Sequence, residues 1–252
     1  MAYLRAGKSQ IFEKDHILII GWHPRLTGII EEIVRAEERV KKRLDRVSLP
    51  AIAILDEDFS PDMVTNLMQR ISDDVRDKCH LLVRSGNPLE AESLERVDYK
   101  RASSIILLSD PEHQQKRHFS DMTLVKTLLS MRANAGETPL EEMPNVVIEI
   151  ANPANKRLAE SAGWNRRTEA IATDEFMARL FCQSVRHRGI STVYTHLLTD
   201  LYGESLFLIS AAELDVVGWT LRETIHHFRT SVPIGFMKSI ESDYELEDRL
   251  RI

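Results

Sequence analysis

A chain of 252 residues is long enough to bury a sizeable core, as one large domain or as one domain with a smaller lobe. With 43% hydrophobic and 29% charged residues, it has the composition of a globular protein, which argues against a mainly disordered chain. The formal net charge of -6 opposes binding to a polyanion, so we expect no nucleic-acid partner.

Two features that could suggest special chemistry have ordinary structural explanations. The basic run at residues 39–46 falls at the end of a predicted helix, where cations complement the helix dipole. Cys79 and Cys182 show no metal-ligand spacing and are expected to be reduced thiols. The sequence also has no apolar run long enough to span a bilayer and no signal-peptide core, so we expect a soluble chain.

The first 160 residues alternate between short apolar runs and amphipathic stretches. The runs predict strands, and because they are continuous they indicate strands buried on both faces, as in a parallel sheet: 16–20, 51–55, 81–83, 105–108 and 146–150. Helices are predicted between them, from residue 26 onward and at 61–71, 89–97, 120–133 and 155–162. This order predicts an α/β fold with a doubly wound, parallel Rossmann-like sheet.

The pattern changes after a short sixth strand near Ala170. Thr173 is the expected N-cap of a helix with an apolar stripe, and Gly189 is its expected stop signal. A second helix is predicted at 191–201, and segments 205–210, 218–228 and 235–240 predict a small α+β lobe. The expected divisions are therefore 1–14, 15–172, 173–201 and 202–252.

The loop after the first strand is a degraded phosphate loop. In the register of the dinucleotide fingerprint GxGxxG, the chain has Gly21, His23 and Leu26, so only the first glycine is retained. His23 places a Cβ where a pyrophosphate would approach closest, although the helix N-terminus still predicts an anion site with His23 and Arg25 as donors. Gly28 is expected to be a small helix-packing position. This loop favours a ligand-sensing module over a dehydrogenase.

Other candidate ligand residues follow from the rule that open parallel sheets bind ligands beyond the carboxyl ends of their strands. Asp56 ends the second strand, where it could grip a ribose or, equally, belong to a solvated loop that caps the next helix. The further loop candidates are Arg84, Asp110, Glu149 and Asn152. A cation site could use the hard oxygen ligands of Asp110, Asp121 and Glu149. Recognisable catalytic motifs are absent from the sequence, so we expect no enzymatic activity.

Six motifs, in chain order, resemble the RCK domains, which regulate potassium conductance, and specifically the first such domain of the CASTOR/POLLUX type of ion channel. They are GKSQIFEKDHILIIGW at 7–22, VRSGNPLEAESLERV at 83–97, ASSIILLSD at 102–110, SDMTLVKTLLSM at 120–131, NVVIEIANPAN at 145–155 and AIATDEFMARLFCQSVRHRGI at 170–190. The first motif is the most specific, because the family also places a G-[KR]-S-x-x-x-E segment just before its first strand.

The resemblance implies a gating element on the cytoplasmic face of a membrane channel. Such domains form dimers and then a tetrameric or octameric ring, bind an ion or nucleotide, and transmit ring expansion to the channel pore domain. On this interpretation residues 1–14 are the tether from the last pore helix and residues 173–201 are a crossover arm that pairs subunits. The arm's expected interface residues are Phe176, Leu180, Phe181 and Val185. Trp22, His23 and Arg25 then belong to a specialised ligand or interface loop.

Alternatives remain open at this point. The sequence has no pore helices and one RCK unit where the family normally has two, so it fits an excised fragment or a free-standing regulator. Ca²⁺ or another cation is the expected ligand, ahead of NAD(H) or another nucleotide. The alternative function is an NAD(H)-binding oxidoreductase or redox sensor that uses Gly21, Arg25 and Asp56. A scaffold that only oligomerises is a third hypothesis.

Overall fold

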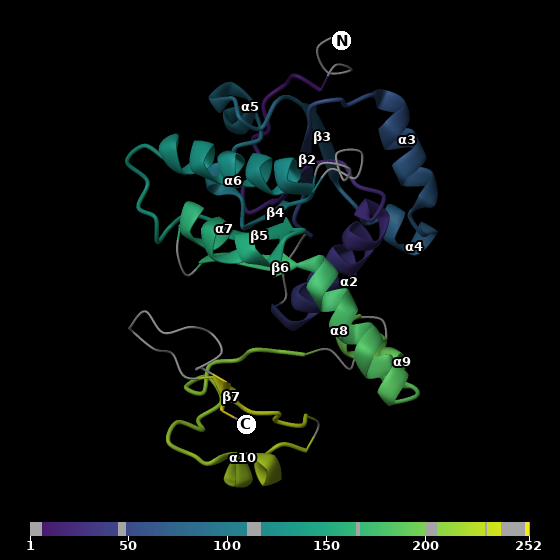
Figure 1. Ribbon diagram of the computed structural model, residues 1–252, viewed down its shortest axis with the longest axis vertical. Coiled ribbons are helices and arrows are strands. Elements are labelled where there is room, and N and C mark those ends of the chain that lie inside the picture. The colour runs from purple at the N-terminus through teal and green to yellow at the C-terminus, as the bar shows by residue number, and fades with distance from the viewer. Residues whose placement is uncertain are drawn as a thin grey trace. The chain divides into compact units, whose positions relative to one another are not determined.

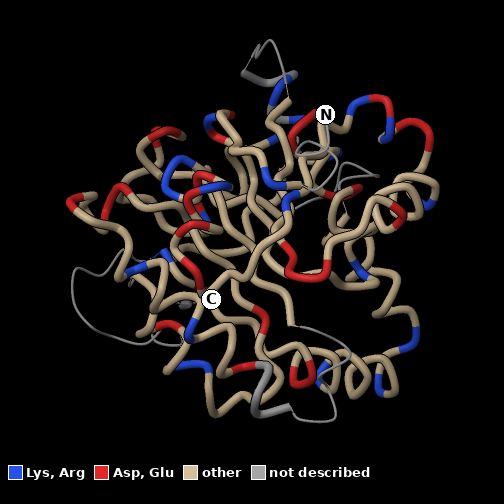
Figure 2. Tube along the Cα trace, turned by 90° about the horizontal axis from the view of Figure 1, so that it is seen from above, with Lys and Arg blue, Asp and Glu red and all other residues tan. Residues whose placement is uncertain are grey.

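A computed structural model describes residues 7–44, 49–109, 117–164, 167–199, 206–229, 231–237 and 250–251 (Figure 1). The chain divides into two compact units, Met1–Ser205 and Leu206–Ile252. Along the described part of the chain, Lys and Arg are interspersed with Asp and Glu (Figure 2). None of the described helices is both long and apolar enough to cross a membrane.

The first unit is built on a parallel six-stranded sheet with the order β3-β2-β1-β4-β5-β6. The strands are β1 (Ile17–Ile20), β2 (Ile52–Asp56), β3 (Leu81–Ser85), β4 (Ser104–Leu107), β5 (Asn145–Ile150) and β6 (Thr168–Ala172). At the centre, Leu18 of β1 is in register with Ala53 of β2 and Ile105 of β4. The order of strand addition reverses between β1 and β4, which creates the switch point of a doubly wound fold. The predicted fold class is confirmed.

Helices cover both faces of this sheet (Figure 1). They are α2 (Leu26–Leu44), α3 (Pro61–Arg70), α4 (Asp73–Arg76), α5 (Ala91–Arg96), α6 (Arg117–Ala133) and α7 (Lys156–Ala162), with 3₁₀ turns at Tyr99–Arg101 and Pro153–Asn155. Successive side chains of β1 enter opposite cores: Ile19 packs with residues of α2 and α3, whereas Leu18 and Ile20 pack with residues of α5 and α6. Burial on both faces explains why the sequences of the central strands β1 and β2 are almost continuously apolar.

The first and last glycines of the degraded phosphate loop, Gly21 and Gly28, lie in different surroundings: Gly21 is in close contact with another strand and Gly28 is exposed. Gly21 has a φ of +101°, and a Cβ there would lie 2.8 Å from the carbonyl oxygen of Leu108. Close approach of β1 to the end of β4 therefore requires this glycine. Gly28 is exposed, and a Cβ there would meet nothing within 4 Å. The prediction that Gly28 is a packing position is wrong, because no neighbouring element approaches it.

Two helices follow the sheet, α8 (Thr173–Arg186) and α9 (Ile190–Leu198), with Gly189 at a φ of +91° between them. They extend beyond the sheet (Figure 1), and neither helix contains a buried residue. The end of α9 returns to α2, since the hydroxyl of Thr199 lies 3.1 Å from each carboxylate oxygen of Glu32. The predicted N-cap at Thr173 is wrong: Ala172 is the N-cap residue, and the Thr173 hydroxyl bonds to another strand.

The second unit contains α10 (Leu221–His227) and a short antiparallel pair, β7 (Phe236–Met237) and β8 (Leu250–Arg251). Thr220 and Glu223 form a capping box at the start of α10. The predicted segments at 218–228 and 235–240 contain α10 and β7, whereas the described residues 206–210 form no strand or helix. Among the described residues of this unit, only Val216 and Thr224 are buried.

Candidate functional site

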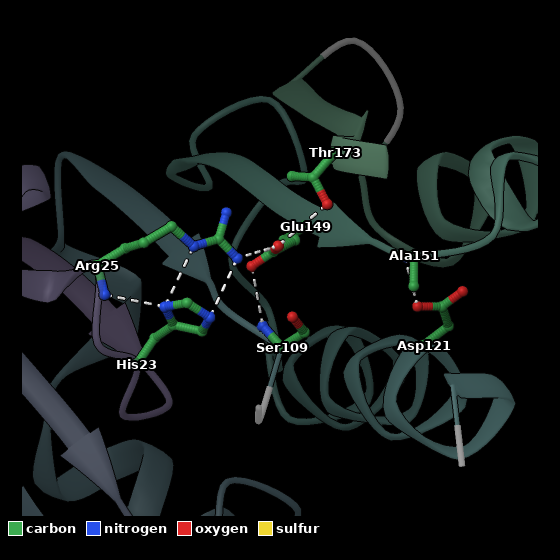
Figure 3. Close-up of polar contacts among 7 residues, drawn as sticks. All are labelled: His23, Arg25, Ser109, Asp121, Glu149, Ala151 and Thr173. Atoms are coloured by element: carbon green, nitrogen blue, oxygen red, sulfur yellow. Dashed lines mark hydrogen bonds and ion pairs between the residues drawn. The ribbon is translucent and has the colours of Figure 1, made fainter. Parts of the chain in front are cut away.

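The switch point lies where the carboxyl ends of β1 and β4 part. Figure 3 shows that residues from four places in the sequence meet there: the loop before α2, the end of β4, the end of β5 and the start of α8. Ligands of doubly wound folds bind at this position. We refer to His23, Arg25, Ser109, Glu149 and Thr173 together as the switch-point network.

His23 holds the guanidinium of Arg25. The imidazole is only 7% exposed. Its Nδ1 accepts hydrogen bonds from the backbone N–H of Arg25 at 3.0 Å and from Arg25 Nε at 3.1 Å. Arg25 Nη2 lies 3.1 Å from His23 Nε2, so the arginine side chain wraps one edge of the ring (Figure 3). These contacts fix the direction in which Arg25 points.

Arg25 points at Glu149, whose carboxylate joins the network together. Arg25 Nη2 forms an ion pair with Glu149 Oε1, which also accepts a hydrogen bond from Thr173 Oγ1 at 3.2 Å. Glu149 Oε2 accepts a hydrogen bond from the backbone N–H of Ser109 at 3.3 Å. The Glu149 side chain is 8% exposed and the Arg25 side chain is 48% exposed. A carboxylate of the chain itself therefore occupies the place beside Arg25 where we expected an external anion to bind.

The residues expected to hold a cation do not form a ligand group in the described structure. Asp121 is fully buried, and its oxygens accept hydrogen bonds from the backbone N–H groups of Ala151 and Asn152 and from Asn155 Nδ2, at 2.8–3.0 Å. Glu149 is paired with Arg25, and Asp110 lies outside the described residues. Within the described ranges, no group of three or more His, Cys, Asp or Glu side chains could hold a metal ion. The expected metal site thus gains no support from this part of the chain.

The remaining ligand candidates make local contacts apart from the switch-point network. Asp56 Oδ1 accepts a hydrogen bond from the N–H of Asp58 at 3.0 Å, which fits the interpretation of this segment as a loop. Asn152 accepts one from the N–H of Ala154 at 3.0 Å and caps a 3₁₀ turn. Arg84 Nε donates to the carbonyl of Ser9 at 2.5 Å. Burial, aided by repulsion from Arg96, lowers the pKa of Arg84.

Trp22 lines a small cavity instead of joining the network. The cavity has a volume of about 220 Å³ and lies between the loop at residues 22–24 and one side of α3. Thr27 also lines the cavity, and its hydroxyl is buried without a hydrogen-bond partner in the described structure. Other lining residues are His23, Pro24, Met63, Asn66, Leu67 and Arg70.

The sequence motif before β1 forms a docked segment whose contacts we did not foresee. The N–H of Ser85 donates to the carbonyl of Gly7 at 3.0 Å, and the N–H of the buried Ile11 donates to the carbonyl of Arg96 at 2.8 Å. His16 is fully buried, with its ring nitrogens 2.9 Å from the carbonyl of Val97 and 3.1 Å from that of Glu13. Burial lowers the pKa of His16 despite these two acceptors. The motif at 7–22 was the available signal, but its partners lie in α5 and β3.

The expected interface residues are uncovered in the single chain. Phe176, Phe181 and Val185 of α8 are 46%, 64% and 88% exposed, and Leu180 is partly exposed. On α9, Val193 and Leu198 are also exposed. Large apolar side chains exposed together on a helix pair are typical of a surface that another protein surface covers.

Comparison with known proteins confirms the resemblance that the motifs indicated. The chain is 24% identical over 234 residues to "Probable ion channel POLLUX" of Arabidopsis thaliana, a match that covers 92% of this chain and 26% of that protein. It is also 24% identical over 234 residues to "Ion channel CASTOR" of Lotus japonicus, covering 92% of this chain and 25% of the relative. The chain thus spans about a quarter of the length of the curated relatives that it matches. No family model matches it.

One of the matched solved structures, the human SLO3 gating ring, supports the same type of fold. The human SLO3 gating ring aligns with 79% of this chain and 31% of its own, with a TM-score of 0.50 and 13% sequence identity. The GsuK RCK domain aligns with 67% of this chain and 28% of its own, with a TM-score of 0.42 and 17% identity.

Proposed function

We propose that this chain is the cytosolic regulatory domain of a cation channel, where it couples binding of an ion or a nucleotide to opening of the pore. The observation that carries this proposal is the similarity to proteins named as ion channels, which extends over 92% of the chain. The Rossmann-like fold and the uncovered helix pair support it. The chain acts by binding and conformational change, without catalysing a reaction.

The helices α8 and α9 serve as the arm by which two copies associate. A whole aromatic side chain buries on the order of 150–250 Å², and Phe176 and Phe181 are still 46% and 64% exposed for a partner to cover. At about 25 cal/mol per Å², the Phe176, Phe181 and Val185 side chains together contribute several kcal/mol to association. Dimers formed through the arm assemble further into a ring of four or eight subunits beneath the pore domain.

The ligand acts by shifting the population of ring conformations. A ligand that binds one conformation better than the other biases the ring toward it. The switch-point network connects the expected ligand position to the start of α8, so a change at the loop can reach the arm. Ca²⁺, another cation, or a nucleotide such as NAD(H) is the input signal to be tested.

A chimaera tests this function directly. The chain replaces the matching quarter of the Arabidopsis thaliana POLLUX protein, and cation currents are recorded from membranes that contain the chimaera. We expect currents that respond to the ligand supplied on the cytoplasmic side, and a loss of that response in F181E. Well-assembled chimaeras whose currents are the same with F181E and without it would contradict the proposal.

A further inference from the structure

The Glu149 carboxylate connects the switch point to α8. It lies at the end of β5 and bonds at once to the loop before α2, to the end of β4 and to the first residue of α8. These segments are far apart in the sequence, with Arg25 and Glu149 separated by 124 residues. The helix α8 directly follows β6, so Thr173 is positioned both by the chain and by this side-chain contact.

Burial makes these contacts obligatory for Glu149. A carboxylate that is 8% exposed loses most of its hydration and must be compensated by a cation or by hydrogen-bond donors. Arg25, Ser109 and Thr173 supply that compensation. The positive end of the α8 dipole adds to it, because Glu149 accepts its bond from Thr173 at the helix N-terminus. Loss of one partner therefore changes the balance among the others.

The two ends of this connection differ in access. Arg25 is about half exposed, so an anion from solution can approach its guanidinium, whereas Glu149 is enclosed. A guanidinium binds phosphate oxygens in the same forked geometry as a carboxylate, so the two compete for it. An oxyanion that takes Arg25 leaves the Glu149 charge buried and held only by neutral donors.

We propose that Glu149 is an internal latch: it holds the first turns of α8 to the switch point while Arg25 is bound to it, and a phosphate-bearing anion that captures Arg25 loosens α8. The latch is a property of the fold and does not depend on the presence of a pore. The chain thereby carries its own competitor for the anion position.

Hydrogen exchange of the α8 amides at residues 177–180 measures the latch. These amides bond to carbonyls of the first helical turn, so their exchange reports whether that turn is held. In the unliganded chain, we expect T173V and E149Q to raise their exchange rate at least tenfold, while amides of β1 and β5 stay protected. T195V is the matched control, because Thr195 is exposed and its hydroxyl donates to the carbonyl of Ser191 within α9. Unchanged α8 exchange in T173V, in a folded chain, would overturn the latch even if E149Q fails to fold.

A titration with inorganic pyrophosphate, at constant ionic strength, tests the competition. We expect pyrophosphate to raise exchange of the same α8 amides in the natural chain and to have no such effect in R25Q. In E149Q, where the competing charge is gone, pyrophosphate should bind at least tenfold more tightly. Pyrophosphate that protects α8, or that leaves its exchange unchanged in the natural chain up to millimolar concentration, would refute the competition.

Discussion

The two glycines of the degraded phosphate loop give opposite predictions for the same substitution. In G21A the new Cβ lies 2.8 Å from the Leu108 carbonyl oxygen, and the residue must keep a φ of +101°. A non-glycine residue in such a conformation costs about 1–3 kcal/mol, and relief of the clash requires β1 and β4 to separate at the switch point. We expect G21A to lower the free energy of unfolding by roughly 2–4 kcal/mol.

G28A is the matched control on the same loop and helix. Nothing lies within 4 Å of a Cβ at position 28, and Gly28 is exposed within α2. Since alanine is the better helix former, G28A should raise the free energy of unfolding by about 0.5–1 kcal/mol. Urea unfolding followed by far-ultraviolet circular dichroism measures both changes. Equal effects of the two substitutions, or a destabilising G28A, would refute the assignment of Gly21 to the sheet contact and of Gly28 to open solvent.

Three further predictions concern the arm, the buried histidine and the alternative function. In light scattering, the double variant F181E/V185E should shift the chain toward monomer, whereas Q183E, at an exposed polar position of α8, should not. A natural chain that is already monomeric at high concentration would contradict the proposal that α8 and α9 associate two copies. Burial lowers the pKa of His16 from its usual 6.5, so the unfolded chain takes up a proton that the folded chain does not. The contribution of His16 to stability is therefore full above about pH 6.5 and is lost as the pH drops through the folded-state pKa; H16Q should flatten this dependence in urea unfolding, and an unchanged pH dependence in H16Q would contradict the assignment. We expect millimolar NAD to leave the melting temperature unchanged, which would remove both the oxidoreductase alternative and NAD as the regulatory ligand; stabilisation that grows with NAD concentration would retain both.

Periodicity and spacing predicted the strands and the longer helices of the first unit, but not the short helix α4. The five continuous apolar runs and the short sixth strand expected near Ala170 each matched a strand within a few residues. A strand that is buried on both faces, such as β1, selects apolar residues at every position. The ordered motifs also predicted the similarity to CASTOR and POLLUX channels, which the comparisons confirmed. In the second unit, the segments at 218–228 and 235–240 contain α10 and β7, whereas the described residues 206–210 form no helix or strand.

The candidate site was predicted less well than the fold. The position of His23 and Arg25 at the switch point was predicted from the sequence, because the loop after β1 must lie there in any doubly wound fold. It also identified Glu149, Asp121 and Thr173 as chemically notable, but as two cation ligands and a helix cap. In the structure Glu149 pairs with Arg25, Asp121 fixes the loop after β5, and Thr173 bonds to Glu149.

The sequence by itself determined the parallel sheet, its helices and the position of the loop, since these depend on local periodicity and on the handedness of the connections. Only the tertiary structure decided which groups compensate each buried charge. A carboxylate removed from water must find a partner wherever the fold supplies one, and for Glu149 that partner is 124 residues away in the chain. The retained Gly21 likewise owes its place to the carbonyl of Leu108 on a neighbouring strand, a contact that no spacing within the loop could reveal.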